Sequence, residues 1–232
     1  LVADIHYDEK LAILALENGA DKIRFNPGNL SSIEKVKRLA ACARAHHAPI
    51  RVGVNAGSLE KDLLRQFGGP KPEVMVESAL RHVRLLEQMD FTDIVVSLKA
   101  SNVPDTLAAY RGIHALTEYP LHVGVTEAGD RLSGVVKSAI GIGCLLLEGI
   151  GDTIRVSLTG DPVAEVLAAK EILRAVGLRR EGVEIIACPT CGRCRVDLEA
   201  AVARVRERCP DSPRPLKVAV MGCVVNGPGE AA

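Results

Sequence analysis

The sequence predicts an α/β protein: a (β/α)8 barrel of the TIM type with six of its eight strand–helix units present, followed by a small α/β domain. Three observations carry this prediction. Short β-rich runs alternate with amphipathic helical stretches up to about residue 180, as expected for βαβ units and a parallel sheet. Polar side chains recur near the carboxyl end of each of these runs. Beyond residue 180 the chain changes character and gathers five of its seven cysteines.

The barrel strands are expected at six apolar, β-rich runs, which are residues 1–6, 22–26, 50–55, 93–99, 121–126 and 153–159. The helical stretches between them have recognisable ends. Ser31 lies three residues before Glu34, which is the spacing of a capping box, and the helix is expected to run to about residue 45. Asp161 followed by Pro162 predicts a capped helix start, and Gly177 predicts the end of that helix.

Each predicted strand carries polar residues near its carboxyl end. Because side chains alternate between the two faces of a strand, residues two or four positions apart point the same way. In a barrel, such interior positions form the active site, whereas an open doubly wound sheet concentrates polar groups at one switch point. The barrel is therefore favoured, and two further units are expected before Leu1. The polar sets are Asp4 and His6, Arg24 and Asn26, Arg51 and Asn55, Ser97 and Lys99, His122 with Glu127, and Arg155 and Ser157.

The composition of this barrel mouth predicts an anionic ligand. Four cations (Arg24, Arg51, Lys99 and Arg155) stand against two carboxylates (Asp4 and Glu127). Such a local excess suits a phosphate ester or a diphosphate. The sequence has neither a G-x-G-x-x-G after a strand nor a G-x-x-x-x-G-K-[ST], so a nucleotide held in those ways is unsupported.

Composition also excludes several classes of function. Lysine plus arginine (29) equals aspartate plus glutamate (29), which argues against a general nucleic-acid or anionic-membrane surface. Tryptophan is absent and aromatic residues make up 3%, so a base-stacking platform is not expected. No apolar run approaches the ~18 residues needed to span a bilayer. With too few cysteines for a disulfide scaffold, the protein is expected to be cytoplasmic.

We place the domain boundary after residue 178, giving a partial substrate-binding barrel at 1–178 and a small α/β domain at 179–232. In the second domain, strands are expected at 183–187 and 216–221. The intervening helix is indicated by apolar residues at i, i+3, i+4 and i+7, which are Leu198, Ala201, Val202 and Val205. A domain of this size is small enough to need a metal for stability.

The cysteines of this domain have the spacing of a metal or cluster site. Cys188 and Cys191 form a C-x-x-C pair, and Cys223 follows the second predicted strand, which suits either zinc or an iron–sulfur cluster. The fourth ligand has two candidates: Glu230, on the turn Asn-Gly-Pro-Gly-Glu, and Cys194. The remaining three cysteines (Cys42, Cys144 and Cys209) have no partner spacing.

Longer motifs give the chain a resemblance to a known family. They include Ile23-Arg-Phe-Asn-Pro-Gly-Asn29, Arg51-Val-Gly-Val-Asn-Ala-Gly-Ser58, Ile154-Arg-Val-Ser-Leu-Thr-Gly-Asp161 and Val220-Met-Gly-Cys-Val-Val-Asn-Gly-Pro-Gly-Glu230. Over essentially all 232 residues the chain resembles the 4-hydroxy-3-methylbut-2-enyl diphosphate synthases of the non-mevalonate isoprenoid pathway. Family members are longer at both ends, so the chain is expected to be a fragment.

The resemblance implies an oxidoreductase. Its substrate would be 2-C-methyl-D-erythritol 2,4-cyclodiphosphate, opened and dehydroxylated with two electrons from ferredoxin or flavodoxin through a 4Fe-4S cluster. It implies Cys188, Cys191, Cys223 and Glu230 as cluster ligands, with Glu230 exchangeable, and Glu127 as the acid–base group. It implies a homodimer in which the cluster domain caps the partner's barrel. The diphosphate would be held by Arg24, Asn26, Arg51, Asn55, Lys99, Arg155 and Ser157, with Asp4 and His6 as second-tier candidates.

Two other functions remain open on the residues alone. One is a zinc-stabilised, phosphate-binding barrel with no redox role. The other is a different barrel enzyme acting on a phosphorylated sugar, in which the cysteines are purely structural.

Overall fold

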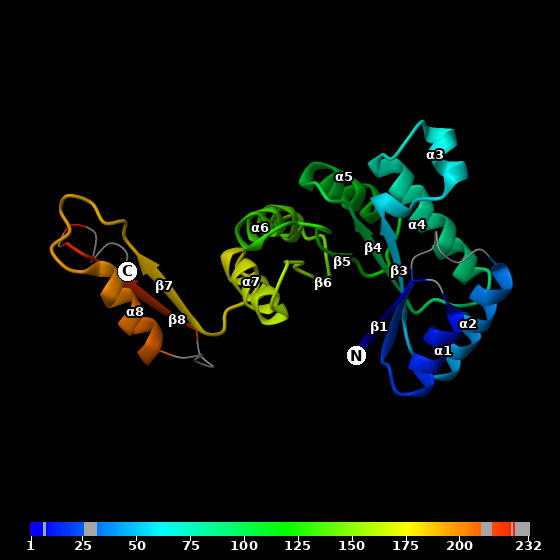
Figure 1. Cartoon of the computed structure of the whole chain (residues 1–232), viewed down its shortest axis with the longest axis horizontal. Coiled ribbons are helices and arrows are strands. Elements are labelled where there is room, and N and C mark those ends of the chain that lie inside the picture. The colour runs from blue at the N-terminus through cyan, green and yellow to red at the C-terminus, as the bar shows by residue number, and fades with distance from the viewer. Residues whose placement is uncertain (7, 26–31, 210–214, 224, 226–232) are drawn as a thin grey trace. The chain divides into compact units, whose positions relative to one another are not determined.

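The fold is described here from a computed structural model, which describes residues 1–6, 8–25, 32–209, 215–223 and 225 (Figure 1). The chain forms two compact units, Leu1–Ile172 and Leu173–Ala232, and each is considered by itself. The domain boundary expected after residue 178 stays a prediction. None of the described helices is both long enough and apolar enough to cross a membrane.

The first unit alternates strands and helices along its whole length. Its elements in chain order are β1 (Val2–Ile5), α1 (Glu9–Glu17), β2 (Lys22–Phe25), α2 (Ile33–Ala45), β3 (Ile50–Asn55), the 3-10 turn η2 (Ala56–Ser58), α3 (Lys61–Phe67), α4 (Pro72–Glu87), β4 (Ile94–Lys99), α5 (Val103–His114), β5 (His122–Val123), α6 (Arg131–Leu147), β6 (Thr153–Ile154) and α7 (Pro162–Ala175).

Strand order in this unit follows chain order, and every pairing is parallel. The strands β1 to β4 form one sheet, β5 pairs with β6, and a parallel bridge between Val96 and Leu121 joins the two sets. An order without reversal is that of a singly wound barrel, whereas a doubly wound sheet reverses direction at its switch point. The described strands therefore follow the predicted barrel topology.

Alternation along the strands separates a polar inner face from an apolar outer face. Ile23, Phe25, Val52 and Leu98 are all at most 2% exposed and belong to one hydrophobic core. The helices α1, α4 and α5 pack against strands of this sheet. The interleaved positions carry the charged side chains, because they face away from that core.

The observed helix ends agree with the sequence-based prediction at α7 and differ from it at the start of α2. Pro162 opens α7, the amide of Val163 donates to Asp161 Oδ1 at 2.9 Å, and Gly177 follows the helix with φ 75°. Helix α2 instead begins at Ile33 with Ser32 in the cap position, so the capping box predicted from Ser31 is wrong by one residue. Ser32 makes no side-chain cap hydrogen bond in this structure.

Strands β5 and β6 are shorter than predicted, at two residues each. The residues that follow each strand continue the hydrogen bonding without forming a regular ladder. The amide of Arg155 donates to the Val123 carbonyl at 2.9 Å, and the amide of Thr126 donates to the Ala100 carbonyl at 3.1 Å. The segment that follows β5 is therefore still held beside the end of β4, and the segment that follows β6 is held beside β5.

The second unit contains two parallel strands, β7 (Val183–Ala187) and β8 (Leu216–Val220), with α8 (Leu198–Arg208) between them in sequence. Asp197 caps α8 by accepting a hydrogen bond from the amide of Ala200 at 3.0 Å. Because the strands are parallel, the segments that follow Ala187 and Val220 emerge at the same edge. This edge bears the cysteines.

Candidate functional site

The inner face of the first unit brings side chains from neighbouring strands into one layer. Parallel register aligns Asp4 with Arg24 and Arg24 with Arg51, and it aligns Asn55 with Lys99. Asp4, Asn55 and Lys99 lie at or next to the carboxyl ends of their strands, where barrel enzymes bind their ligands, whereas Arg51 is the second residue of β3.

Arg24 is a buried cation of this layer and makes several polar contacts. It is 5% exposed, and its guanidinium donates to Asp4 Oδ1 at 2.8 Å and to the Gly53 carbonyl at 3.3 Å. His6 Nδ1 lies 3.5 Å from the same guanidinium. Partial burial acts to raise the pKa of Asp4, but the hydrogen bond and charge of Arg24 outweigh it and hold that pKa below its usual value.

Gly53 leaves the space that the Arg24 side chain occupies. A Cβ at this position would lie 2.3 Å from Arg24 Nε, closer than real side chains approach. An alanine here would therefore displace the Arg24 side chain, so Gly53 leaves room for the guanidinium in its present position.

Two further cations in the layer are buried. Arg51 is 9% exposed and its Nε has no hydrogen-bond partner among the described residues. Lys99 is 6% exposed. Burial, and then the charges of Arg155 and Arg51, lower the pKa of Lys99 to about 7. The cations therefore repel one another more than the single carboxylate offsets, and an anion would relieve that repulsion.

These side chains line one cavity of about 200 Å³. It holds four cations and one carboxylate, which gives the local positive excess that the sequence predicts. The lining residues are Asp4, His6, Arg24, Arg51, Asn55, Ser97, Lys99, Thr126 and Arg155.

Two other described residues that the sequence predicts for the site are not brought into this cavity. Ser157 and Glu127 do not line it, and Glu127 is exposed with φ 50°. Asn26 and Glu230 lie outside the described residues. The sequence did not single out Thr126 as a site residue, although it lies four positions beyond His122 and so has the periodicity that places it on the inner face.

His122 lies on β5 but does not line the cavity. Its ring is 8% exposed, with Nδ1 2.8 Å from Thr153 Oγ1 and Nε2 without a partner among the described residues. Burial and the charges of Lys99, Arg51 and Arg155 lower its pKa to about 2. His122 is therefore a neutral imidazole at physiological pH.

The cysteines of the second unit lie in the segments that leave β7 and β8. The amide of Cys188 donates to the Val220 carbonyl at 3.4 Å, and the amide of Gly222 reaches Cys188 Sγ at 3.4 Å. Cys223 directly follows that glycine. The two strand ends therefore bring Cys188 and Cys223, which are distant in sequence, to the same edge.

Cys191 and Cys194 belong to the turn that follows Cys188. Cys191 is exposed, and the backbone amide and guanidinium of Arg193 lower the pKa of its thiol. Cys194 Sγ lies at Gly222, where an added Cβ would be 2.4 Å from it, and it donates to the Val196 carbonyl at 3.2 Å.

The donor chemistry of this edge fits a soft metal centre, because thiolates accept amide N–H groups and bind iron or zinc. Within the described residues, however, no three His, Cys, Asp or Glu side chains stand close enough to hold a metal ion. All seven cysteines are free thiols. The three predicted cysteine ligands thus share a region without forming a closed ligand set.

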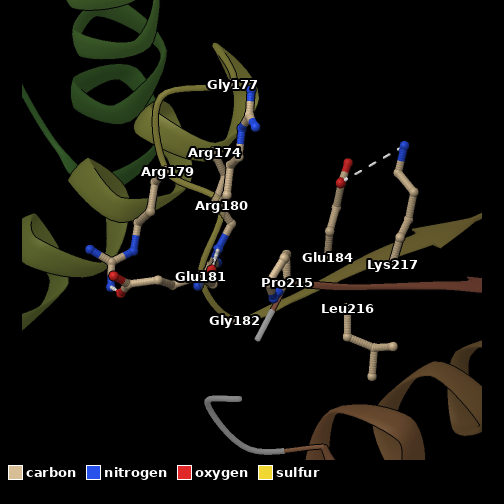
Figure 2. A pocket seen from close by; sticks show the side chains of 10 residues that line it. All are labelled: Arg174, Gly177, Arg179, Arg180, Glu181, Gly182, Glu184, Pro215, Leu216 and Lys217. Carbon is tan, nitrogen blue, oxygen red and sulfur yellow. Dashed lines mark hydrogen bonds and ion pairs between the residues drawn. The ribbon is translucent and has the colours of Figure 1, made fainter. Parts of the chain in front are cut away.

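A larger cavity of about 320 Å³ lies in the second unit (Figure 2). Its charges are partly paired: Arg179 Nη2 lies 2.9 Å from Glu181, and Lys217 Nζ lies 3.9 Å from Glu184. Figure 2 shows that Leu216 extends to the other side of its strand from this ion pair. None of the predicted ligand-binding residues lines this cavity, so size alone does not identify the site.

Fold and site together define a class: a parallel α/β barrel with a cationic mouth, joined in one chain to a small α/β unit with a cysteine-bearing edge. The GcpE TIM-barrel domain model matches residues 1–170, and the GcpE protein C-terminal domain model matches residues 184–232. The chain belongs to the GcpE family.

Curated relatives carry one name. Proteins of Caldanaerobacter subterraneus (61% identical) and Fusobacterium nucleatum (58% identical) are each called 4-hydroxy-3-methylbut-2-en-1-yl diphosphate synthase (flavodoxin). Each match covers 100% of this chain and 65% of the relative, so the chain spans less than two thirds of their length. A solved structure of oxaloacetate acetylhydrolase matches 99% of this chain and 78% of its own chain at 12% identity, with a TM-score of 0.45.

Proposed function

We propose that this chain is part of a 4-hydroxy-3-methylbut-2-en-1-yl diphosphate synthase. The reaction would open the ring of 2-C-methyl-D-erythritol 2,4-cyclodiphosphate and remove a hydroxyl with two electrons. The observation that supports this best is the cavity in which Arg24, Arg51 and Lys99 converge with Arg155 around a single carboxylate. Membership in the GcpE family and the shared name of the relatives support the substrate assignment.

The residues of the cavity would bind and orient the two phosphates. Arginine presents planar pairs of N–H donors that match phosphate oxygens, and such charge-assisted bonds are about twice as strong as neutral ones. Asp4 would keep the Arg24 guanidinium in a fixed orientation through their 2.8 Å contact. Asn55 would add a neutral donor, and His6 also lines the cavity. Asn26 and Ser157 are proposed as further neutral contacts to the diphosphate.

Glu127 is proposed as the group that exchanges a proton near the substrate carbons. It is the carboxylate that follows β5 and lies on the loop at the carboxyl end of that strand. Its side chain is exposed and its backbone is in the left-handed region. Barrel enzymes commonly draw such groups from these loops.

A 4Fe-4S cluster would be held by Cys188, Cys191, Cys223 and Glu230 and would supply single electrons to the substrate. The name of the relatives supports flavodoxin as the electron donor, with ferredoxin as the other candidate. A homodimer and a cytoplasmic location remain predictions.

Metal content tests the redox part of this proposal. After anaerobic purification and reconstitution with iron and sulfide, we expect broad absorption near about 400 nm that bleaches with dithionite. Cys188→Ala should lose it and Cys194→Ala should keep it. A colourless protein with one zinc per chain would support the zinc-stabilised alternative instead. Full activity in Glu230→Ala with cluster loss in Cys194→Ala would overturn the ligand assignment.

Substrate binding is tested separately by calorimetry with the cyclodiphosphate. We expect Arg51→Gln to weaken binding by roughly 10- to 100-fold, since a charged hydrogen bond contributes about 1.5–3 kcal/mol. Arg65→Gln is the matched control, because Arg65 is exposed on α3 and does not line the cavity. Equal affinities in the two variants would refute the site, and turnover with a reduced viologen in a full-length relative would test the reaction itself.

A further inference from the structure

The amine of Lys99 occupies an unusual position in the cavity. Lys99 is only 6% exposed, yet its side chain lines the cavity and does not belong to the hydrophobic core. Among the described residues it makes no hydrogen bond or ion pair. An ammonium group has three donors and normally finds acceptors or water, so a charged lysine would be poorly solvated here.

The elements packed around Lys99 present mostly positive charge. They contribute Arg24 from β2, Arg51 from β3 and Arg155 after β6. Arginine is the side chain that is effectively always charged in proteins. Asp4 from β1 is the one carboxylate of the cavity, and it is already paired with Arg24 at 2.8 Å. A fourth positive charge is therefore unfavourable until an anion enters.

The two histidines nearby do not change this balance. His122 on β5 is buried and neutral, and its lowered pKa has the same cause as that of Lys99, namely burial among these cations. His6, which directly follows β1, contacts Arg24 and Asp4, and its side chain is 48% exposed. Solvent can therefore screen a charge on His6, whereas Lys99 has little contact with solvent.

We propose that Lys99 is a largely neutral amine in the ligand-free protein and takes up one proton when the cyclodiphosphate enters the cavity. This inference rests on the proposed function and adds a proton linkage to it. The step is an acid–base one: the Lys99 amine gains a proton from solvent and becomes an ammonium, with no redox change and no bond broken in the ligand.

The ligand cannot supply or absorb that proton. In a cyclic diphosphate both phosphorus atoms are esterified and share the anhydride oxygen, so each retains one strongly acidic hydroxyl. Its charge therefore stays at about −2 across the neutral range. Any proton taken up on binding must come to the protein, and binding must weaken as the pH rises above the titration midpoint of Lys99.

The amine can be observed directly in the chain carrying 13Cε-labelled lysine, by following proton–carbon correlations against pH. Lys99→Arg identifies the Lys99 signal by its loss, and exposed Lys10 is the internal reference. We expect Lys99 to titrate near pH 7, well below the value of about 10.4 that is usual for a lysine amine. A Lys99 midpoint near 10 in the ligand-free chain would overturn the proposal.

Addition of cyclodiphosphate tests the linkage. At saturation we expect the Lys99 midpoint to rise above about 9. Calorimetry at about pH 7.5 in two buffers of different ionisation enthalpy should give uptake of about 0.8 proton per chain, falling to near zero in Lys99→Arg. Uptake that persists in Lys99→Arg would assign the proton to another group, such as His6, and refute the proposal.

Failure of the proposed function would look different. Suppose that Lys99 titrates near pH 7 and that its midpoint rises with inorganic diphosphate but not with the cyclodiphosphate. The neutral amine is then supported and the substrate assignment is wrong. If the cyclodiphosphate binds with no uptake of protons, the substrate assignment stands and the linkage is wrong.

Discussion

Replacing Gly53 by alanine should weaken anion binding by moving Arg24. The new Cβ would lie 2.3 Å from Arg24 Nε, and ordinary contacts begin at about 3.4 Å, so the guanidinium must move by about 1.1 Å. That movement is enough to break its 2.8 Å contact with Asp4 and its 3.3 Å bond to the Gly53 carbonyl. Displacements of this size in a binding group commonly cost up to about 100-fold in rate.

The expected loss follows from the bond that Arg24 would make to the ligand. A hydrogen bond from a charged group contributes about 1.5–3 kcal/mol, which corresponds to a roughly 10- to 100-fold weaker Kd for the cyclodiphosphate. Overpacking should lower the free energy of unfolding by about 1–3 kcal/mol. In a full-length relative carrying the same change, KM should rise more than kcat falls.

Calorimetry with the cyclodiphosphate measures this effect, and urea unfolding reports the stability separately. Gly57→Ala is the matched control, because nothing lies within 4 Å of the Cβ that it would add. We expect Gly57→Ala to bind within about twofold of the parent. If Gly53→Ala also bound within twofold, Arg24 would not be positioned by Gly53 for the ligand, and the reasoning would fail.

Three further changes test the scaffold and the cysteine edge. Glu60 accepts hydrogen bonds from His82 at 2.8 Å and from Ser78, and these outweigh burial to lower its pKa. The ionised Glu60 carboxylate therefore stabilises the folded state above the pKa that it has in the unfolded chain. This stabilisation is lost as the pH falls through its lower pKa in the folded state. In urea titrations Glu60→Gln should cost about 1–3 kcal/mol at pH 7, with the difference shrinking below about pH 4; a pH-independent difference would contradict this. Tyr110→Phe removes a fully buried hydroxyl that bonds to two strand backbones, and thermal unfolding should show a loss of about 1–3 kcal/mol; an unchanged Tm would count against it. Gly222→Ala would place a Cβ 2.4 Å from a cysteine sulfur and should reduce iron retained after reconstitution; retention equal to the parent would refute that expectation.

The sequence was sufficient for the strand order and for most of the cavity. Inner and outer positions alternate along each strand, so the spacing of Asp4 and His6, or of Arg51 and Asn55, already assigned them to one face. Parallel strands end at a common edge, so residues from separate runs were expected to meet there. This reasoning uses only periodicity and chain direction, and both are local properties of the sequence.

The same reasoning missed contacts that cross between elements. His82 has no partner that helical spacing would indicate, yet its Nε2 lies 2.8 Å from Glu60, which is 22 residues earlier. Ser157 follows the pattern of inward-facing pairs but does not line the cavity. Strand β6 ends at Ile154, so regular alternation no longer governs the segment that carries Ser157.

By itself, the sequence determined the fold class, the sign of the charge at the barrel mouth and the grouping of the cysteines, because these depend on residue type and spacing. Only the tertiary structure decided which charges are paired and which are buried together. Arg24 has a carboxylate partner and Lys99 has none among the described residues, although both are basic residues that line the same cavity. Their difference arises from burial and from the summed field of neighbouring strands, which depend on distances in space rather than on positions along the chain.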